Sequence, residues 1–183
     1  MKRGLIIVDM QNDYFPGGKM ELVGMPSAAQ HAQGVLEEFR SRNMPVFHIQ
    51  HISLNPGATF FLPETQGAAI HPSVAPSAAE PVIRKHFPNS FRDTPLLKEL
   101  QQRDIGEVVI CGAMSHMCID ATVRAAFDLG LRCNVVSDAC ATRDLKFGQE
   151  VVPAAQVHAA FMAALSAPFA RVVEADKVAP LLG

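Results

Sequence analysis

The chain has 183 residues, of which 49% are hydrophobic and 19% are charged. These proportions are typical of one compact domain over residues 1–183 and exclude a disordered chain. The net charge of -2, without any basic run, argues against a protein that binds nucleic acid or an anionic membrane surface. Four cysteines without a Cys-x-x-Cys pair give no indication of a zinc ribbon.

The apolar run near the start of the chain is too short for an export signal. Lys2 and Arg3 supply a positive start, but the run covers only residues 4–8 and ends at Asp9. No other stretch is apolar over a length that spans a membrane. We therefore expect a cytoplasmic protein with a small-molecule substrate and no membrane or nucleic-acid partner.

Strand and helix patterns alternate along the chain. Apolar, β-branched runs predict strands over 4–8, 45–49, 81–84, 108–111, 133–137 and 170–173. Helical spacing predicts helices over 27–42, 94–103, about 116–130 and 149–165. Residues 11–24 are turn-rich, and residues 53–79 form a long irregular stretch with four prolines. A loop of that length is typical of a binding loop or a lid.

This alternation predicts an α/β protein with a parallel sheet between two helix layers, a three-layer α/β/α, Rossmann-like arrangement with right-handed crossovers. In such sheets, ligands bind beyond the carboxyl ends of the strands. Asp9, Lys85, Cys118 and Asp138 each follow the end of a predicted strand. We therefore expect these four side chains to share one edge of the sheet.

Cys118 lies where a buried strand, residues 108–111, passes through Gly112 into a helix that ends near Gly130. Free backbone N–H groups and the helix dipole at this position favour a thiolate, so we expect a lowered thiol pKa. The same N–H groups can hold a developing oxyanion. Buried cysteines are otherwise inert packing residues, and this is the interpretation for Cys111, Cys133 and Cys140.

An acid, a base and a thiol at one edge suggest a division of labour. Cys118 would attack a carbonyl, and Asp9 would take the thiol proton and return it to the leaving group. Lys85 would orient the carboxylate and support a thiolate by its charge. Taken singly, Asp9 fits a capping carboxylate and Lys85 a solvated cation at a strand end. Together with the thiol, they favour catalysis.

Three stretches carry a resemblance to a known family. They are LIIVDMQNDYFPGG, RKHFPNSFRDTPL, and VVICGAMSHMCIDATVRAAFDLG followed by VVSDAC. In this order they resemble the isochorismatase-like cysteine hydrolases, which include nicotinamidase, N-carbamoylsarcosine amidase and isochorismatase. The resemblance covers residues 5–144.

The resemblance implies a six-stranded parallel sheet, a catalytic triad of Asp9, Lys85 and Cys118, and a homo-oligomer, dimeric or larger. It also implies a non-proline cis peptide between Ala113 and Met114. The N–H groups of Met114 and Cys118 would then form an oxyanion hole.

The sequence departs from the metal-binding members of that family. Nicotinamidases hold a metal through an Asp-x-His motif after the second strand, whereas this chain has His48-Ile49-Gln50-His51 there. In an extended chain, His48 and His51 point to opposite faces, and His71 is distant in sequence. We therefore expect no metal and no other cofactor.

The substrate contacts are less well defined by sequence. Phe15 and Phe91 flank the motif loops, and Phe61 lies in the long loop that can cover the site. His116 is either a donor to the substrate or a solvated residue of the first helical turn.

The leading hypothesis is a hydrolase that cleaves a small amide or related C–N bond through an acyl-enzyme on Cys118. One alternative is vinyl ether hydrolysis of the isochorismatase type, which has been argued not to need the thiol. Another is a non-catalytic small-molecule-binding member of the fold. A dinucleotide-binding protein is disfavoured, because the loop DMQNDYFPGG lacks Gly-x-Gly-x-x-Gly.

Overall fold

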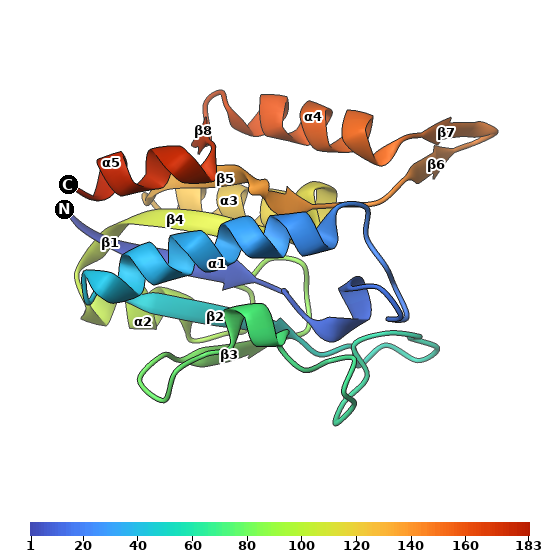
Figure 1. Cartoon of the computed structure of the whole chain (residues 1–183), viewed down its shortest axis with the longest axis horizontal. Helices are drawn as coiled ribbons and strands as arrows, with labels where there is room; N and C mark the ends of the chain where they lie inside the picture. The colour runs from blue at the N-terminus through green and yellow to red at the C-terminus, as the bar shows by residue number, and fades with distance from the viewer.

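A computed structural model describes residues 1–183. Its centre is a six-stranded sheet in the order β3-β2-β1-β4-β5-β8 (Figure 1), and every neighbouring pair is parallel. The strands are β1 (Lys2–Val8), β2 (Val46–His51), β3 (Val82–Lys85), β4 (Ile105–Ala113), β5 (Arg132–Ala141) and β8 (Arg171–Val173). The predicted parallel, six-stranded sheet is confirmed.

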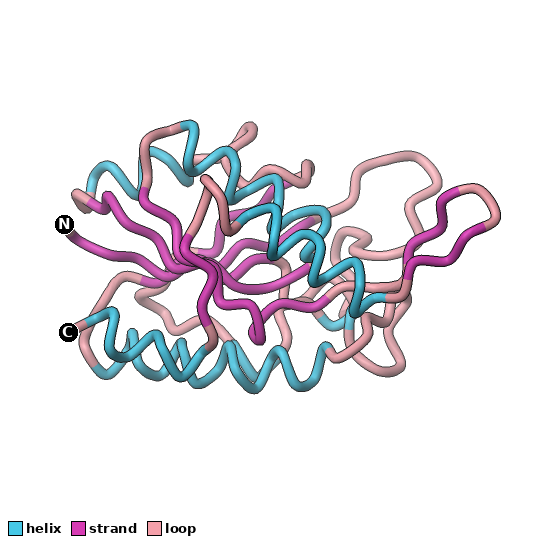
Figure 2. Tube along the Cα trace, turned by 90° about the horizontal axis from the view of Figure 1, so that it is seen from above, coloured by secondary structure: helices cyan, strands magenta, loops and turns pink.

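Helices cover both faces of the sheet, which confirms the three-layer arrangement (Figure 2). Helices α1 (Met25–Ser41) and α5 (Val178–Leu182) belong to the core on one face. Helices α2 (Leu96–Gln102), α3 (Asp120–Asp128) and α4 (Ala154–Leu165) belong to the core on the other. Short helical turns occupy Asn12–Tyr14, Pro72–Val74 and Ala175–Lys177. None of the helices combines the length and apolar character that a membrane crossing requires.

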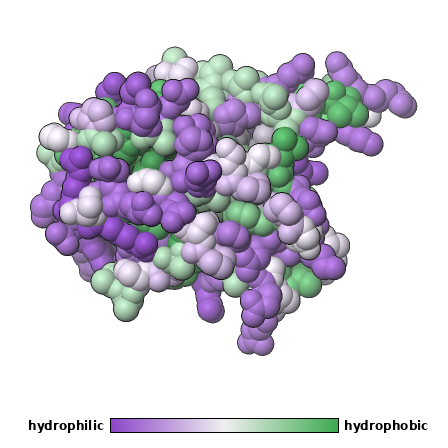
Figure 3. Space-filling model, in the orientation of Figure 1, coloured by the Kyte–Doolittle hydropathy of each residue, from purple (hydrophilic) through white to green (hydrophobic).

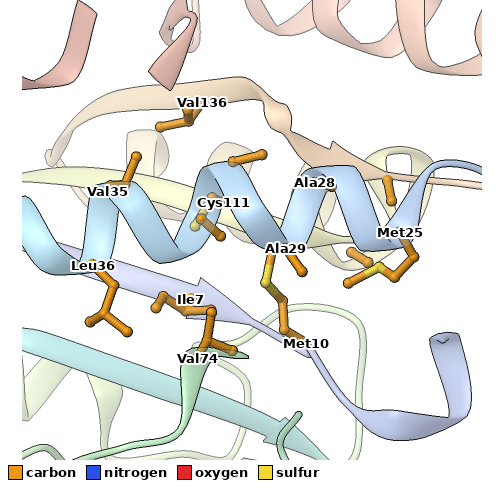
Figure 4. Packing of buried hydrophobic residues seen from close by; sticks show 14 of the residues in the cluster. Ile7, Met10, Met25, Ala28, Ala29, Val35, Leu36, Val74, Cys111 and Val136 are labelled. Carbon is orange, nitrogen blue, oxygen red and sulfur yellow. The ribbon is translucent and has the colours of Figure 1, made fainter. Parts of the chain in front are cut away.

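Helix α1 shows how the sequence produces this packing. Its buried residues, Met25, Ala28, Ala29, Ala32, Val35, Leu36 and Phe39, recur at intervals of three and four and so form one apolar face. Because alanines make up much of this face, the helix lies close to β1, β4 and β5 (Figure 4). Gly24, with a φ of 74°, starts the helix in the left-handed conformation that glycine tolerates.

The prediction of one helix over 149–165 is wrong at its start. Strands β6 (Leu145–Phe147) and β7 (Glu150–Val152) form an antiparallel hairpin that projects from the domain (Figures 1 and 2). Two adjacent valines favour the strand, and α4 begins only after Pro153, whose backbone conformation is extended.

Asp138 does not join the edge where the other polar residues meet, so this prediction is also wrong. Strand β5 continues past it to Ala141 through an irregularity opposite Ile110–Gly112. One carboxylate oxygen of Asp138 accepts the N–H of Ala175 at 2.9 Å, and the other lies 3.3 Å from Nδ1 of His31. The carboxylate therefore connects β5 to the neighbouring segments.

The sheet order reverses between β1 and β4, so the loops after these strands diverge and leave a crevice. Gly112 permits the close approach of the two strands there, since any Cβ on it would overlap the carbonyl oxygen of Val8. Its φ of 129° is also a conformation that other residues rarely adopt.

We predict that Gly112→Ala lowers the free energy of unfolding by about 3 kcal/mol or more, because overlap and backbone strain add. The matched control is Gly34→Ala in α1, where a Cβ meets nothing within 4 Å. Helix propensity should make this control more stable by about 0.5–1 kcal/mol. Urea denaturation measures both, and equal stabilities would contradict the role assigned to Gly112.

Candidate active site

Three of the four side chains predicted to converge do so at the sheet edge. Nζ of Lys85 lies 2.6 Å from Oδ2 of Asp9 and 3.2 Å from Sγ of Cys118. Asp9 and Lys85 are 0% and 1% exposed, and Cys118 is 3% exposed. Neither carboxylate oxygen of Asp9 accepts a hydrogen bond, although both are buried, and Oδ2 is the one paired with the Lys85 charge. The cluster is therefore a buried ion pair beside a thiol, and Oδ1 of Asp9 is the carboxylate oxygen free to accept a proton.

Each residue is placed by the end of a different strand. Asp9 follows β1 with a φ of 51°, and its N–H donates to the carbonyl of Ile49 on β2. Lys85 is the last residue of β3. Cys118 lies in a π-helical turn, Ser115–Ile119, that leads from β4 into α3. This turn takes the place of the α-helical first turn that the sequence predicted, and wide π turns are frequent at functional sites.

The predicted lowering of the Cys118 pKa is wrong for this structure. Burial raises the thiol pKa, and the nearby Asp9 charge raises it further, while Lys85 opposes both effects. Burial also works against the charge of Lys85, yet the ion pair with Asp9 and the contact with Cys118 outweigh it and raise the lysine pKa. The resting cluster is therefore a lysine–carboxylate ion pair beside a neutral thiol.

The peptide between Ala113 and Met114 is cis, as the resemblance implied. The N–H of Met114 donates no hydrogen bond within the chain. This is compatible with the expected oxyanion hole of Met114 and Cys118, which stays a prediction.

A cavity of about 450 Å³ opens onto Cys118. Aromatic side chains form much of its wall, namely Tyr14, Phe60, Phe61 and Phe87. Polar groups come from His51, Ser53, Asn55 and His86, and no Asp, Glu, Lys or Arg lines it. Such a space suits a small, uncharged molecule with an aromatic or apolar body.

Of the predicted substrate-binding residues, only Phe61 lines this cavity. Phe15 stacks on His71 at 3.6 Å between ring centroids, beside a separate crevice. Phe91 is partly buried and packs against the hydrophobic core to which α2, α3 and α4 contribute. Nδ1 of His116 lies 2.6 Å from Oγ1 of Thr142, and its ring meets the edge of Phe161. These three side chains have partners within the protein and do not face the cavity.

Sequence reasoning missed Tyr14 and His51 in the site. Tyr14 is the only tyrosine of the chain and lies beside Phe15 in the turn-rich segment, but nothing in the sequence says which ring turns inward. His51 was considered only as a metal ligand. Its place at the end of β2, the strand next to β1, was a usable signal.

The histidines of β2 do not form a metal site together. Nε2 of His48 lies 2.9 Å from Glu80, whereas Nδ1 of His51 lies 3.0 Å from Nζ of Lys85. Donor atoms of Asp9, His51 and Cys118 do lie within 4.8 Å of one another. The Lys85 ammonium group already lies among them, so this set does not fit a resident metal ion.

The profile of the isochorismatase domain family matches residues 3–177. The chain belongs to the isochorismatase family. It is 52% identical over 172 residues to the isochorismatase family protein YddQ of Bacillus subtilis, covering 94% of this chain and 96% of that protein. The match to a solved structure from Oleispira antarctica has a TM-score of 0.94 and 51% identity, over 98% and 96% of the two chains. A nicotinamidase/pyrazinamidase of Mycobacterium tuberculosis is 32% identical over 157 residues, which cover 74% of this chain and 84% of that enzyme.

We predict that alkylation of Cys118 by iodoacetamide keeps accelerating above pH 9, because its pKa is raised above the ordinary thiol value. Asp9→Asn should move this profile to lower pH, since the variant removes the negative charge and leaves that of Lys85. Mass spectrometry of the Cys118 peptide measures the rate. Asp138→Asn, which removes a carboxylate outside the cluster, is the control. A plateau below pH 8 in the wild type would restore the thiolate interpretation.

Proposed function

We propose that the protein hydrolyses a small, uncharged amide or related C–N bond through an acyl-enzyme on Cys118. The observation that carries this proposal is the buried cluster of Asp9, Lys85 and Cys118, which opens onto a cavity without charged walls. A neutral thiol, a free carboxylate oxygen and a cavity of this kind meet the requirements of nucleophilic amide cleavage.

The first half of the reaction forms a thioester. As Sγ of Cys118 attacks the carbonyl carbon, its proton passes to the free Oδ1 of Asp9, so no thiolate has to exist beforehand. The carbonyl oxygen becomes an oxyanion, which the N–H groups of Met114 and Cys118 would hold. When the tetrahedral intermediate collapses, Asp9 returns the proton to the leaving nitrogen, and ammonia or an amine departs.

The second half releases the acid. Water attacks the thioester while Asp9 takes one of its protons, and the Cys118 sulfur leaves and regains a proton from Asp9. Lys85 is a positioning residue in both halves. Its ammonium group stays 2.6 Å from Oδ2 of Asp9 and keeps Oδ1 directed to the reaction.

Two observations favour an amide over the vinyl ether of isochorismate. Isochorismate carries two carboxylates, whereas no arginine or lysine lines the cavity, and Lys85 behind it is paired with Asp9. In addition, the related Mycobacterium tuberculosis enzyme is named as a nicotinamidase/pyrazinamidase. A non-catalytic binding role would not account for the buried Asp9–Lys85 ion pair beside the Cys118 thiol.

The test is product release from a panel of small amides, ureido compounds and isochorismate. We expect turnover of at least one neutral amide and a loss of about a thousandfold or more in Cys118→Ala, because the nucleophile is removed. Cys133→Ala, a buried cysteine at the start of β5, is the matched control. Isochorismate turnover that survives Cys118→Ala would contradict the proposal in favour of the vinyl ether reaction. Inactivity across the panel would favour a binding role.

We also propose that the protein forms a homo-oligomer through α4 and the β6–β7 hairpin. Phe147 and Val151 on the hairpin are 84% and 50% exposed, and an isolated two-stranded hairpin is only marginally stable in water. The outward face of α4 carries alanines at 155, 159, 160, 163 and 164 and no charge. Figure 3 shows hydrophobic surface over both elements. A second copy of the chain, packed on these two elements, would cover their apolar surface.

We expect light scattering after size-exclusion chromatography to give the molar mass of at least a dimer. Phe147→Ser should lower this mass toward that of a monomer. Leu129→Ser, which changes an apolar residue 45% exposed next to α3, is the control and should leave the mass unchanged. A wild-type monomer at all concentrations would contradict the assembly.

A further inference from the structure

The Lys85 ammonium group makes three hydrogen bonds and one ion pair. Besides Oδ2 of Asp9 at 2.6 Å and Sγ of Cys118 at 3.2 Å, its Nζ lies 3.0 Å from Nδ1 of His51 and 3.1 Å from the carbonyl oxygen of Phe87. An ammonium group has three N–H donors. These three donors match the hydrogen bonds to His51, Phe87 and Cys118, while Asp9 holds the lysine as its ion partner.

The contact between Nζ of Lys85 and Nδ1 of His51 fixes which nitrogen of the His51 ring carries the proton. An ammonium group can only donate, so Nδ1 must accept, and a neutral ring then carries its proton on Nε2. Burial, together with the charges of Lys85 and His86, lowers the His51 pKa to about 4, although the Asp9 charge opposes this shift. A histidine with a lowered pKa stays neutral above that value, so the ring is uncharged at pH 5 and above.

The backbone of His51 is held from the neighbouring loop. Gln11, which is 0% exposed, accepts the N–H of His51 through Oε1 at 2.7 Å. Nε2 of Gln11 donates to the carbonyl oxygens of His51 and Ala68, both at 2.8 Å. The backbone of His51 is thus held by Gln11 and its ring by Lys85. The Phe61 ring packs beside the His51 ring, with 5.9 Å between the ring centroids. His51 therefore has little freedom to turn.

The Nε2 atom of His51 faces the cavity. His51 lines the same cavity as Cys118, and Nε2 neither bonds to any group of the protein nor is sealed from solvent. The cavity therefore presents one pre-oriented N–H donor on the same wall as the nucleophile.

We propose that His51 determines specificity by donating from Nε2 to a hydrogen-bond acceptor of the substrate, while its Nδ1 positions Lys85. This inference rests on the proposed amide hydrolysis and narrows its substrate class. The substrate would be a neutral amide with a second acceptor, such as a ring nitrogen or a carbonyl oxygen, close to the scissile group. An amide of the same shape without this acceptor would leave the His51 N–H unpaired. A site built to hydrogen-bond one substrate group discriminates strongly against an analogue that lacks that group.

The kinetic test uses the three pyridinecarboxamides and benzamide, which differ only in the presence and position of a ring nitrogen. We expect kcat/KM to favour one pyridine isomer over benzamide by tenfold or more. In His51→Asn, the short amide can still accept from Lys85 but presents nothing at the position of Nε2, so this ratio should fall toward one. In His51→Gln, an amide N–H reaches the Nε2 position, so part of the ratio should return, while kcat falls for all substrates because Lys85 loses an acceptor.

His31→Asn controls for the loss of a histidine, since His31 lies on α1, pairs with Asp138 of β5 and does not line the cavity. If Cys118→Ala abolishes amide turnover but His51→Asn keeps the wild-type ratio, the proposed function stands and the inference about His51 is overturned.

A second readout does not need turnover. In the Cys118→Ala protein, ¹⁵N NMR of the imidazole should show an Nε2–H tautomer from pH 5 to 8, and its signal should shift on binding a pyridinecarboxamide but not benzamide. This result would support the His51 inference even if the panel showed no turnover. An Nδ1–H tautomer, titration near pH 6.5, or no shift with any of the four amides would overturn it.

Discussion

The ion pair between Lys85 and Asp9 is the interaction on which the rest of the site depends. Both side chains are buried, and removing two charges from water costs several kcal/mol for each ion unless their geometry compensates. Here the ammonium group lies 2.6 Å from the carboxylate and has further acceptors in His51, Phe87 and Cys118. The pair is therefore satisfied mainly on the lysine side, while one carboxylate oxygen is left free to take part in proton transfer.

The sheet topology makes this geometry possible. Asp9 and Cys118 follow the two strands between which the strand order reverses, and Lys85 ends the edge strand β3. Gly112 lets β4 approach β1 without a Cβ between them. Gln11 connects the loop after β1 to His51 at the end of β2 through two hydrogen bonds, and to Ala68 through a third, all at or below 2.8 Å. The reacting groups are consequently held by rigid strand ends, and the irregular segments provide mainly the cavity walls.

Burial also decides the protonation states of the cluster. A thiol at the start of a helix in water would lose its proton more easily than free cysteine. In this structure Cys118 is nearly inaccessible and close to a carboxylate, so burial and the charge of Asp9 outweigh the lysine. Because Asp9 is a base next to the neutral Cys118 thiol, the proposed attack of the sulfur on the substrate would include the transfer of the thiol proton to Asp9. His51 follows the same logic, because burial and the neighbouring lysine keep it neutral and fix its tautomer.

The sequence by itself determined the α/β class, the six strands to within a few residues at most ends, and the meeting of Asp9, Lys85 and Cys118. It could do so because hydrophobic periodicity and the carboxyl ends of parallel strands are local signals with a fixed consequence in space. The β6–β7 hairpin was missed because its short strands adjoin a helical pattern. Asp138 was misplaced because strand β5 continues past it to Ala141.

Only the tertiary structure decided the pKa of Cys118, the aromatic cavity and the part played by His51. The burial of a residue depends on segments that are far apart in the chain. The direction in which a side chain of a long loop points depends on such segments as well. Phe15 and Phe61 show this, since both are aromatic residues in loops, yet one stacks on His71 and the other lines the cavity. The contact between Lys85 and His51 joins residues 34 positions apart, and no spacing rule in the sequence encodes it.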